Sequence, residues 1–526
     1  MKRLSSMRES HGTYTDEQAL SVMIDAGLTK SQYTMMQQRG KKVGCSLLPS
    51  YKRVSKAKTA CLPPQNAIAV EPDQARVKMQ QLLDHTTARL LQLQAEVLSS
   101  VTTDFPAQLT LHCKWGMDGS SAHSQYKQTG VPQDDQMFIV SLVPLQLETH
   151  SGAIVWRNAT PSSTRFCRPL SLQFAKETKA LTEDELQRTR AEVADLQPLV
   201  TDAAIVTHMM TMTMVDGKTV NVATGTASTQ RCSMCGLTSK SFNDLEAVAA
   251  RPVTNVEYGL SSLHCWIRSF ECLLHISYRL PLTLDARGHV PTDQKPLFEE
   301  QKNEVKSAFR RRMGLRVDEP RAGGSGTSND GNTARRAFSS AADFAACTGL
   351  EQQLIEDIHV VLQAVSCFYP VNAEALSAFC KRAAERYVSL YGWYPMSTTL
   401  HRLLAHSAAV IDNFDLPIGM MSEEAAESLN KCICEFRLKH TRKDSRLHTM
   451  SDMFGYLLVA SDPVLSSVGQ QERRRKYARR QGTLLPETLR LLADPALPAV
   501  GMVEGCDCPV ENGDSSESSS SSESDE

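Results

Sequence analysis

The stretch QLTLHCKWGMD, residues 108–118, decides the fold expected for this chain. Apolar and polar residues alternate along it, which is the pattern of a strand that buries one face. The stretch ends at Asp118 and is followed at once by Gly119-Ser120-Ser121. The carboxylate therefore stands where a rigid strand passes into a loop, a common position for chemistry. The alternative interpretation is that Asp-Gly-Ser-Ser only makes a turn.

The composition is that of a folded protein. The 526 residues are 41% hydrophobic, which is enough for two or three domains with a substantial core. The net charge is −2, but the segment from Glu511 onward holds six acids and no base, so the rest of the chain carries +4. A mildly basic body with an acidic serine-rich tail permits a nucleic-acid partner without requiring one.

The first residues, MKRLSSMRESHGT, lack the apolar core of a signal peptide, and no apolar run is long enough to span a bilayer. The sequence therefore predicts an intracellular protein with no membrane partner. In a reducing compartment, its fifteen cysteines are better explained as free thiols or metal ligands than as disulfides.

Strand and helix patterns alternate after residue 118. Strand patterns cover residues 137–148, 152–158 and 168–175, and a charged, leucine-bearing helix covers 182–199. A further alternating run leads to Asp216, just before a glycine. Two carboxylates thus follow strands, and the order of elements predicts an α/β fold.

The segments before residue 108 are expected to be mainly helical. Residues 16–38 predict two helices separated at Gly27-Leu28, either a helix-turn-helix or, more simply, a helical hairpin. Basic residues between 41 and 58 could lie along phosphates or be solvated. Apolar residues at helical spacing predict one long amphipathic helix over 72–99, which could dimerise or cap the domain.

Two pairs of residues have the chemistry of zinc ligands. Cys232 and Cys235 in RCSMC have CxxC spacing, which is half of a zinc site. His401 and His406 are possible partners, and otherwise core or surface histidines. Five residues on a regular helix correspond to about 140° around its axis, so joint ligation would require a helix end or a distortion.

Other segments suggest phosphate contacts. The glycine-rich segment 321–338 leads into Arg335 and Arg336, and its N–H groups and guanidiniums could bind a phosphate. It lacks the Gly-Lys-Ser/Thr ending of a P-loop, and a disordered linker is the alternative. The run RRRKYARR, residues 473–480, suits nuclear import or phosphate contact, and the acidic tail is expected to be disordered. A helix beginning at Ser422 carries Glu427, whose simple interpretation is a surface ion pair with Lys431.

In their order, these segments resemble the catalytic core of the V(D)J recombination-activating protein and the related Transib-type DDE transposases. The similarity runs from about residue 109 to about residue 467. Three landmarks hold Asp118, Asp216 and Glu427: KWGMDGSSAHSQYK, MVDGKTVNV and AESLNKCICEFRLKHTRKDSR. The others are RPLSLQFAKET, SSLHCWIRSFE, NDGNTARRAF and HRLLAH.

The resemblance implies an RNase H-like catalytic fold with a large helical zinc-binding insertion. Asp118, Asp216 and Glu427 would hold two Mg²⁺ or Mn²⁺ ions for DNA nicking and strand transfer. The structural zinc would be bound by Cys232, Cys235, His401 and His406. The residues expected to contact double-stranded DNA are Arg335, Arg336, Arg442 and Lys443. A homodimer, an accessory recombinase subunit and a nuclear location also follow from the resemblance.

The expected organisation has seven segments. They are an N-terminal helical, possibly DNA-binding region (1–60), an amphipathic and possibly dimerising helix (61–106), a first RNase H-like part (107–230), a helical zinc-binding insertion (231–410), a final RNase H-like helical part (411–468), a basic segment (469–510) and the acidic tail (511–526). The chain has no RING-type array and no clear sequence-reading DNA domain upstream of the core. An alternative function is therefore a transposon-derived DNA-binding or chromatin protein with lost or unused catalysis, and a further one is a zinc scaffold that does not bind nucleic acid.

Overall fold

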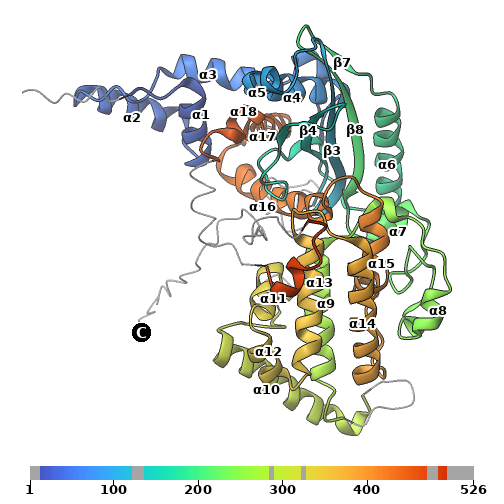
Figure 1. Cartoon of the computed structure of the whole chain (residues 1–526). Helices are drawn as coiled ribbons and strands as arrows, with labels where there is room; N and C mark the ends of the chain where they lie inside the picture. Colours follow the sequence, from blue (N-terminus) through green and yellow to red (C-terminus); the bar gives the residue numbers. More distant parts are fainter. Residues whose placement is uncertain (1–11, 121–135, 283–289, 321–326, 471–483, 495–526) are drawn as a thin grey trace, which may run out of the picture.

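The computed structural model describes residues 12–120, 136–282, 290–320, 327–470 and 484–494. The described strands form one sheet in the order β1-β2-β6-β4-β3-β8-β7, with β5 paired to β4 (Figure 1). Their bounds are β1 Ile68–Val70, β2 Gln74–Val77, β3 Ala107–Ser120, β4 Met137–Thr149, β5 Ile154–Arg157, β6 Arg168–Gln173, β7 Leu199–Val200 and β8 Ala204–Met214. Strand β3 pairs antiparallel with β4 and parallel with β8. Its apolar residues are buried, as the alternation predicts.

Helices cover both faces of this sheet. In Figure 1, α16 (Glu424–Lys439) and α17 (Arg446–Ala460) lie on one face and α6 (Lys179–Ala194) on the other. The short helix α7 (Gly217–Ala223) follows β8 directly. The mixed sheet with helices on both faces agrees with the predicted α/β class.

A helical body is inserted between α7 and α16. Helices α9, α13, α14 and α15 run side by side in Figure 1, and α10 and α12 pack at the end away from the sheet. The side-by-side helices are α9 Ser262–Ser277, α13 Gln352–Ser366, α14 Ala373–Tyr391 and α15 Thr398–Asp412, and the others are α8 Leu245–Ala249, α10 Lys295–Met313, α11 Gly331–Phe338 and α12 Ala341–Thr348. Short 3-10 turns lie at Ser239–Ser241, Val256–Tyr258, Thr292–Gln294 and Ile418–Met421. One continuous apolar core joins this insertion to the sheet.

The N-terminal helices have a small core of their own. Helices α1 (Asp16–Asp25), α2 (Lys30–Lys42) and α3 (Tyr51–Ala60) pack around Leu20, Tyr33 and Val54, and Val459 and Leu465 join them from α17 and α18 (Pro463–Ser467). Two capping boxes begin α1 and α2. The helical pair expected over residues 16–38 is therefore present.

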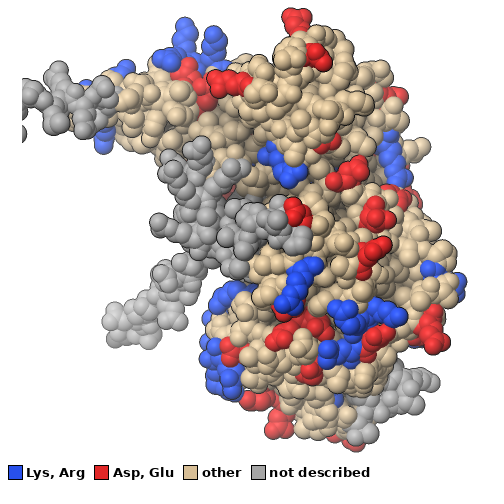
Figure 2. All heavy atoms as spheres, viewed as in Figure 1, with Lys and Arg blue, Asp and Glu red and all other residues tan. Residues whose placement is uncertain are grey.

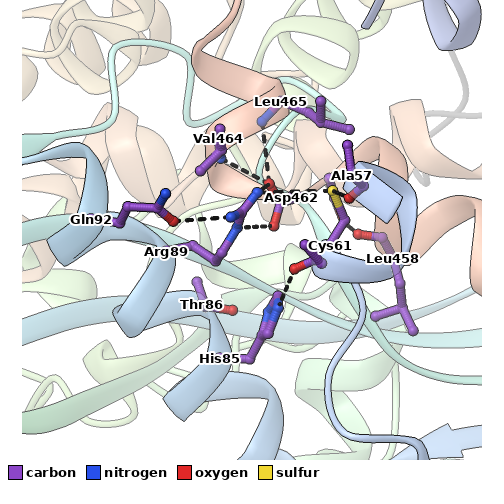
Figure 3. Close-up of polar contacts among 12 residues, drawn as sticks. Ala57, Cys61, His85, Thr86, Arg89, Gln92, Leu458, Asp462, Val464 and Leu465 are labelled. Carbon is purple, nitrogen blue, oxygen red and sulfur yellow. Dashed lines mark hydrogen bonds and ion pairs between the residues drawn. The ribbon is translucent and has the colours of Figure 1, made fainter. Parts of the chain in front are cut away.

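A buried ion pair fastens α4 (Met79–Leu93) to the segment between α17 and α18 (Figure 3). Arg89 of α4 donates to Asp462 through Nε and Nη2, both at 3.0 Å. Asp462 is fully buried and also caps α18 by accepting from the N–H groups of Val464 and Leu465. Because the pair is bidentate and buried, removing either partner would leave an uncompensated charge.

The prediction of one helix over residues 72–99 is wrong. Residues 74–77 form β2, whose alternate residues Ala75 and Val77 are buried while its backbone pairs with β6. The helical spacing holds for the leucines of α4, but residues 74–77 before them pair with the sheet instead of extending that helix. The helix also ends at Gln94, and a second one, α5 (Ala95–Val101), follows.

The remaining described helices are the 3-10 turn Gln65–Ala67 and α20 (Pro486–Leu489). Within the part of the chain that the structure describes, no helix is both long and apolar enough to span a membrane. The basic run 473–480 and the tail from residue 511 lie outside the described residues.

Candidate active site and candidate metal centre

The parallel pairing of β3 with β8 sets Asp118 beside Asp216. Gly116 is in register with Met214, and each acid follows two residues later in its chain. A Cβ on Gly116 would lie 1.8 Å from the Met214 carbonyl oxygen, so only glycine allows the strands to approach this closely. Asp216 then caps α7, because its Oδ1 accepts from the N–H groups of Lys218 and Thr219 at 3.0 and 2.8 Å.

Helix α16 brings Glu427 to the same place. The helix packs against β3 and β8, and the Nδ2 of Asn430 donates to Asp118 Oδ2 at 2.7 Å. The fully buried Lys114 of β3 donates from Nζ to the carbonyl oxygen of Ser422 at 2.6 Å, just before the helix begins. The start of α16 is thus held on the strand that carries Asp118.

The charges of these acids act on one another. Burial raises the pKa of Asp118 well above its usual value, and the charges of Glu427, Asp216 and Glu177 raise it further. Burial also raises the pKa of Glu427; nearby His264 opposes this rise, and Glu423 and Asp216 add to it. Carboxylate oxygens are the ligands that hard divalent cations prefer, so the residue types suit the predicted ions. Among the described residues, however, only Cys232, Cys235, His401 and His406 have donor atoms grouped closely enough to hold a metal ion as they stand.

Glu177 is a fourth carboxylate that the sequence interpretation missed. Burial and the charge of Asp216 raise its pKa, and Lys218 lowers it. A Cβ on Gly119 would meet the Glu177 Oε2 at 2.7 Å, so this side chain lies against the end of β3. The available signal was its position in RPLSLQFAKET, just after β6 ends, as Asp216 comes just after β8. Asp118 itself lies within β3, which continues to Ser120, and not in the loop that the sequence predicts.

The two other glutamates at the start of α16 have different partners. Glu423 is buried and accepts from Ser261 Oγ and from His264, whose Nδ1 lies 3.2 Å from its Oε1. Glu424 forms an ion pair with Arg335. Burial lowers the pKa of His264, but hydrogen bonding to Glu423 and the charges of Glu423, Glu427 and Asp216 outweigh it and raise the pKa to about 9. Among the described residues, Glu427 and Lys431 do not form the ion pair of the simple interpretation.

The four predicted zinc ligands also lie together. One donor atom from each of Cys232, Cys235, His401 and His406 can be chosen so that all lie within 4.8 Å of one another. The Nε2 of His401 lies 3.3 Å from Cys235 Sγ and 3.2 Å from His406 Nε2. Ligand bonds of about 2.0 to 2.3 Å in a tetrahedron require separations of this size. The donor set therefore fits zinc, and all four side chains are buried.

The expected helix distortion is not needed for this grouping. Both histidines lie on the continuous helix α15, and His401 stacks on Phe242 with ring centroids 4.0 Å apart. The two imidazoles meet edge to face with centroids 4.9 Å apart, since their side chains reach around the helix toward the cysteines. A hydrogen bond from Cys235 lowers the pKa of the Cys232 thiol despite its burial, which favours a thiolate, the form that binds zinc.

The expected DNA-contacting residues do not form one cluster. Arg335 is only 15% exposed, pairs with Glu424 and lies over the Trp266 ring. Arg336 is exposed. Beyond α16, Arg442 forms a bidentate surface pair with Asp452 at 2.9 Å, and neighbouring Lys443 donates to Thr441 Oγ1 at 2.7 Å.

The charged side chains on the surface are of both signs. On the face that Figure 2 shows, Lys and Arg side chains are interspersed with Asp and Glu over both the sheet and the helical insertion. Residues 321–326 of the glycine-rich segment lie outside the described residues.

The segment that carries Asp118 and Asp216 matches a known protein family. Residues 110–230 match the family model "Recombination-activation protein 1 (RAG1) RNase H domain". This segment therefore resembles a recombinase RNase H domain, and the predicted resemblance and the RNase H-like fold class are confirmed for it. Asp118, Asp216 and Glu177 lie within the matched residues, whereas Glu427 and the two histidines lie beyond them.

Among solved structures, the "Drosophila P element transposase strand transfer complex" is similar with a TM-score of 0.38 and 9% identity, over 87% of this chain and 92% of that chain. At that TM-score the likeness carries no argument for fold or function. None of the curated proteins matches the chain.

Proposed function

We propose that this protein is a metal-dependent DNA endonuclease and strand-transfer enzyme. The observation that carries the proposal is the parallel register of β3 and β8, which sets Asp118 beside Asp216 at the end of the sheet where α16 presents Glu427. The match of residues 110–230 to a recombinase RNase H domain supports it. The substrate would be double-stranded DNA.

Three side chains would hold the ions. Two divalent cations bound by Asp118, Asp216 and Glu427 would supply activation of the attacking oxygen and stabilisation of the leaving one. Glu177, whose pKa is raised by burial and by the charge of Asp216, would be a fourth ligand. Asn430 orients Asp118 through its hydrogen bond, and the N–H groups of α7 orient Asp216, so both carboxylates are fixed before substrate arrives.

The zinc proposal concerns the insertion. Cys232 and Cys235 come from the loop after α7, and His401 and His406 come from α15. A zinc ion at these residues would fasten the helical body to the segment that follows Asp216. Because all four ligands are buried and come from the protein, the site would be structural rather than catalytic.

Assembly and location are further parts of the proposal. The arrangement implied by the resemblance is a nuclear homodimer on DNA, with an accessory subunit supplying target recognition. The alternative, a DNA-binding or chromatin protein with unused catalysis, has the same fold and differs only in activity.

Nicking of supercoiled plasmid separates these two functions. The purified protein should convert supercoiled DNA to open circles with Mg²⁺ or Mn²⁺ and not with Ca²⁺. Asp118→Asn should abolish this reaction while keeping DNA binding, since asparagine can still accept from Asn430. DNA binding without any nicking by the wild-type protein would favour the alternative.

A further inference from the structure

Arg168 is a fully buried cation at the start of β6. Its Nη1 donates to the carbonyl oxygen of Ser461 at 3.4 Å. Its Nε and Nη2 are also buried, and neither has a hydrogen-bond partner among the described residues. Unpaired N–H groups on a buried charge cost free energy, because the guanidinium loses its hydration without gaining an acceptor. We therefore expect a further acceptor at this side chain.

The guanidinium lies in a junction of four segments, and its neighbours are drawn in Figure 3. Arg89 and His85 belong to α4, Cys61 follows α3 directly, and Asp462 lies between α17 and α18. The charges of Asp462 and Arg89 act on Arg168, and the charge of Arg168 acts on His85. The junction thus connects the N-terminal helices to the sheet.

Positive charge exceeds negative charge in this junction. Among the described residues, Asp462 is the one carboxylate whose charge acts on Arg168, and both of its oxygens already accept from Arg89. Burial lowers the pKa of Arg168 to about 10, Arg89 acts in the same direction and Asp462 opposes them, so the side chain stays charged at neutral pH. Glu17 of α1 acts on Arg89 only, and it is partly exposed. Two guanidiniums and one carboxylate leave one positive charge uncompensated.

The other titratable groups of the junction are neutral. Burial and then the charge of Asp462 raise the pKa of Cys61 to about 12, and its Sγ donates to a backbone carbonyl oxygen of α3 at 3.2 Å, as a thiol does. Burial and then the charge of Arg168 lower the pKa of His85 to about 4. The His85 Nε2 lies 3.1 Å from another carbonyl oxygen of α3, so this nitrogen carries the hydrogen. Neither group therefore compensates the extra charge.

We propose that one small monovalent anion, chloride in ordinary buffers, binds the Nε and Nη2 groups of Arg168 inside this junction. A single negative charge balances the junction, and a charged acceptor forms the stronger hydrogen bonds with a guanidinium. The anion has to be small, because Arg168, Cys61 and Asp462 are all fully buried. Its binding would stabilise the packing of the N-terminal helices against the sheet.

A water molecule is the competing occupant. It would accept from Arg168 and could donate to the Nδ1 of His85, which is buried and has no partner among the described residues. Water would leave the positive charge in place, whereas an anion would remove it. The two occupants therefore differ in how the stability of the protein responds to chloride.

Thermal unfolding of the full chain, without DNA, in mixtures of potassium chloride and potassium glutamate at constant ionic strength tests the proposal. The unfolding temperature of the wild type should rise with chloride and level off as the site fills, by roughly 2 °C at a tenfold excess over its Kd. Arg168→Met should abolish this response. In glutamate alone its unfolding temperature should stay close to that of the wild type, because the substitution also removes the unpaired charge.

Arg76 of β2 provides a matched control. Its guanidinium pairs with Glu185 and Glu192, both at 2.7 Å, so Arg76→Met should lower stability and keep the chloride response. Equal unfolding temperatures of the wild type in the two salts, or the same response in Arg168→Met, would overturn the proposal. If Arg168→Met does not fold, wild-type crystals grown in bromide decide. An anomalous peak beside the Arg168 guanidinium supports an anion, and its absence assigns the position to water.

Discussion

The two ligand clusters of this molecule are built in opposite ways. At the carboxylate site, burial and the charges of neighbouring acids raise the pKa values of Asp118 and Glu427, so the acids repel until a cation or a proton compensates them. At the cysteine–histidine cluster, the donors lie within 4.8 Å, and one thiol is already favoured as its thiolate. Acids that repel one another suit divalent ions that bind and leave with the substrate. A buried site of cysteine and histidine ligands suits an ion that stays bound.

Their positions in the chain differ as well. The acids lie near the end of β3, just after β8 and on α16, and all three are partly exposed. The cysteine–histidine cluster is enclosed between α15 and the loop after α7. We expect loss of the closed cluster to affect folding and loss of the open one to affect only chemistry.

The largest effect should come from removing the cysteine pair. Cys232→Ser combined with Cys235→Ser should lose the expected zinc, about one ion per chain, and unfold at a much lower temperature, because structural zinc sites supply roughly 10–16 kcal/mol of apparent binding free energy in zinc-finger peptides. Elemental analysis and thermal unfolding measure both. Cys380→Ser, a buried cysteine of α14 outside the cluster, should keep its zinc. Full zinc content in the double variant would contradict the site.

The next effect concerns Glu427. Glu427→Gln should lower the Mg²⁺-dependent nicking rate by roughly 10³-fold, since it removes one ligand of the ions that stabilise the transition state. Its unfolding temperature and DNA affinity should stay close to those of the wild type, because the neutral side chain relieves repulsion within the site.

Glu435→Gln is the control on the same helix. Glu435 forms an exposed pair with Lys439, so its loss should change neither nicking nor stability. Equal nicking by Glu427→Gln and Glu435→Gln would return Glu427 to the role of an ordinary helix acid.

A smaller effect is expected in the pH dependence of stability. A carboxyl whose pKa is higher in the folded state than in the unfolded chain binds its proton more tightly when folded. Its stabilising contribution is present at low pH and is lost as the pH rises from about 4 through the raised pKa of Asp118. In buffer without Mg²⁺ or Mn²⁺, the unfolding temperature of wild type should therefore fall more as the pH is raised above about 4 than that of Asp118→Asn. Added Mg²⁺ should cancel the difference, and parallel curves without Mg²⁺ would contradict the repulsion.

The sequence predicted the acids more readily than their surroundings. Alternation up to Asp118 and Asp216 places both at strand ends, because a period of two is a local property. The parallel pairing that brings them together joins residues about a hundred apart, and no local pattern contains it. Glu177 follows β6, but no glycine comes directly after it.

Partners of charged groups were the least predictable feature. Glu423, Glu424 and Glu427 lie close together at the start of α16, yet each has a different neighbour. Glu423 contacts His264, Glu424 pairs with Arg335, and the charge of Glu427 raises the pKa of Asp118. The helix sets the direction of each glutamate side chain, but the partner of that side chain depends on which element of the fold packs against that side of the helix. In the same way, the strand β2 depends on pairing with β1 and β6, two partners that a local helix prediction over these residues does not include.

The smallest effect should be the salt dependence of DNA binding. Each phosphate contact releases counterions, so Arg442→Ala, Lys443→Ala and Arg336→Ala should each reduce the slope of log affinity against log salt by about one unit. Arg442 must exchange its pair with Asp452 for a phosphate, so its loss should change affinity less than that of an unpaired cation while still changing the slope. Arg311→Ala is the matched control, because Arg311 is equally exposed and pairs with Glu304 on α10 of the insertion. Titrations of a labelled duplex at several salt concentrations give the slopes. Slopes equal to that of the wild type in Arg442→Ala and Lys443→Ala would mean that these cations are only solvated. A reduced slope in Arg311→Ala would extend the DNA path to α10.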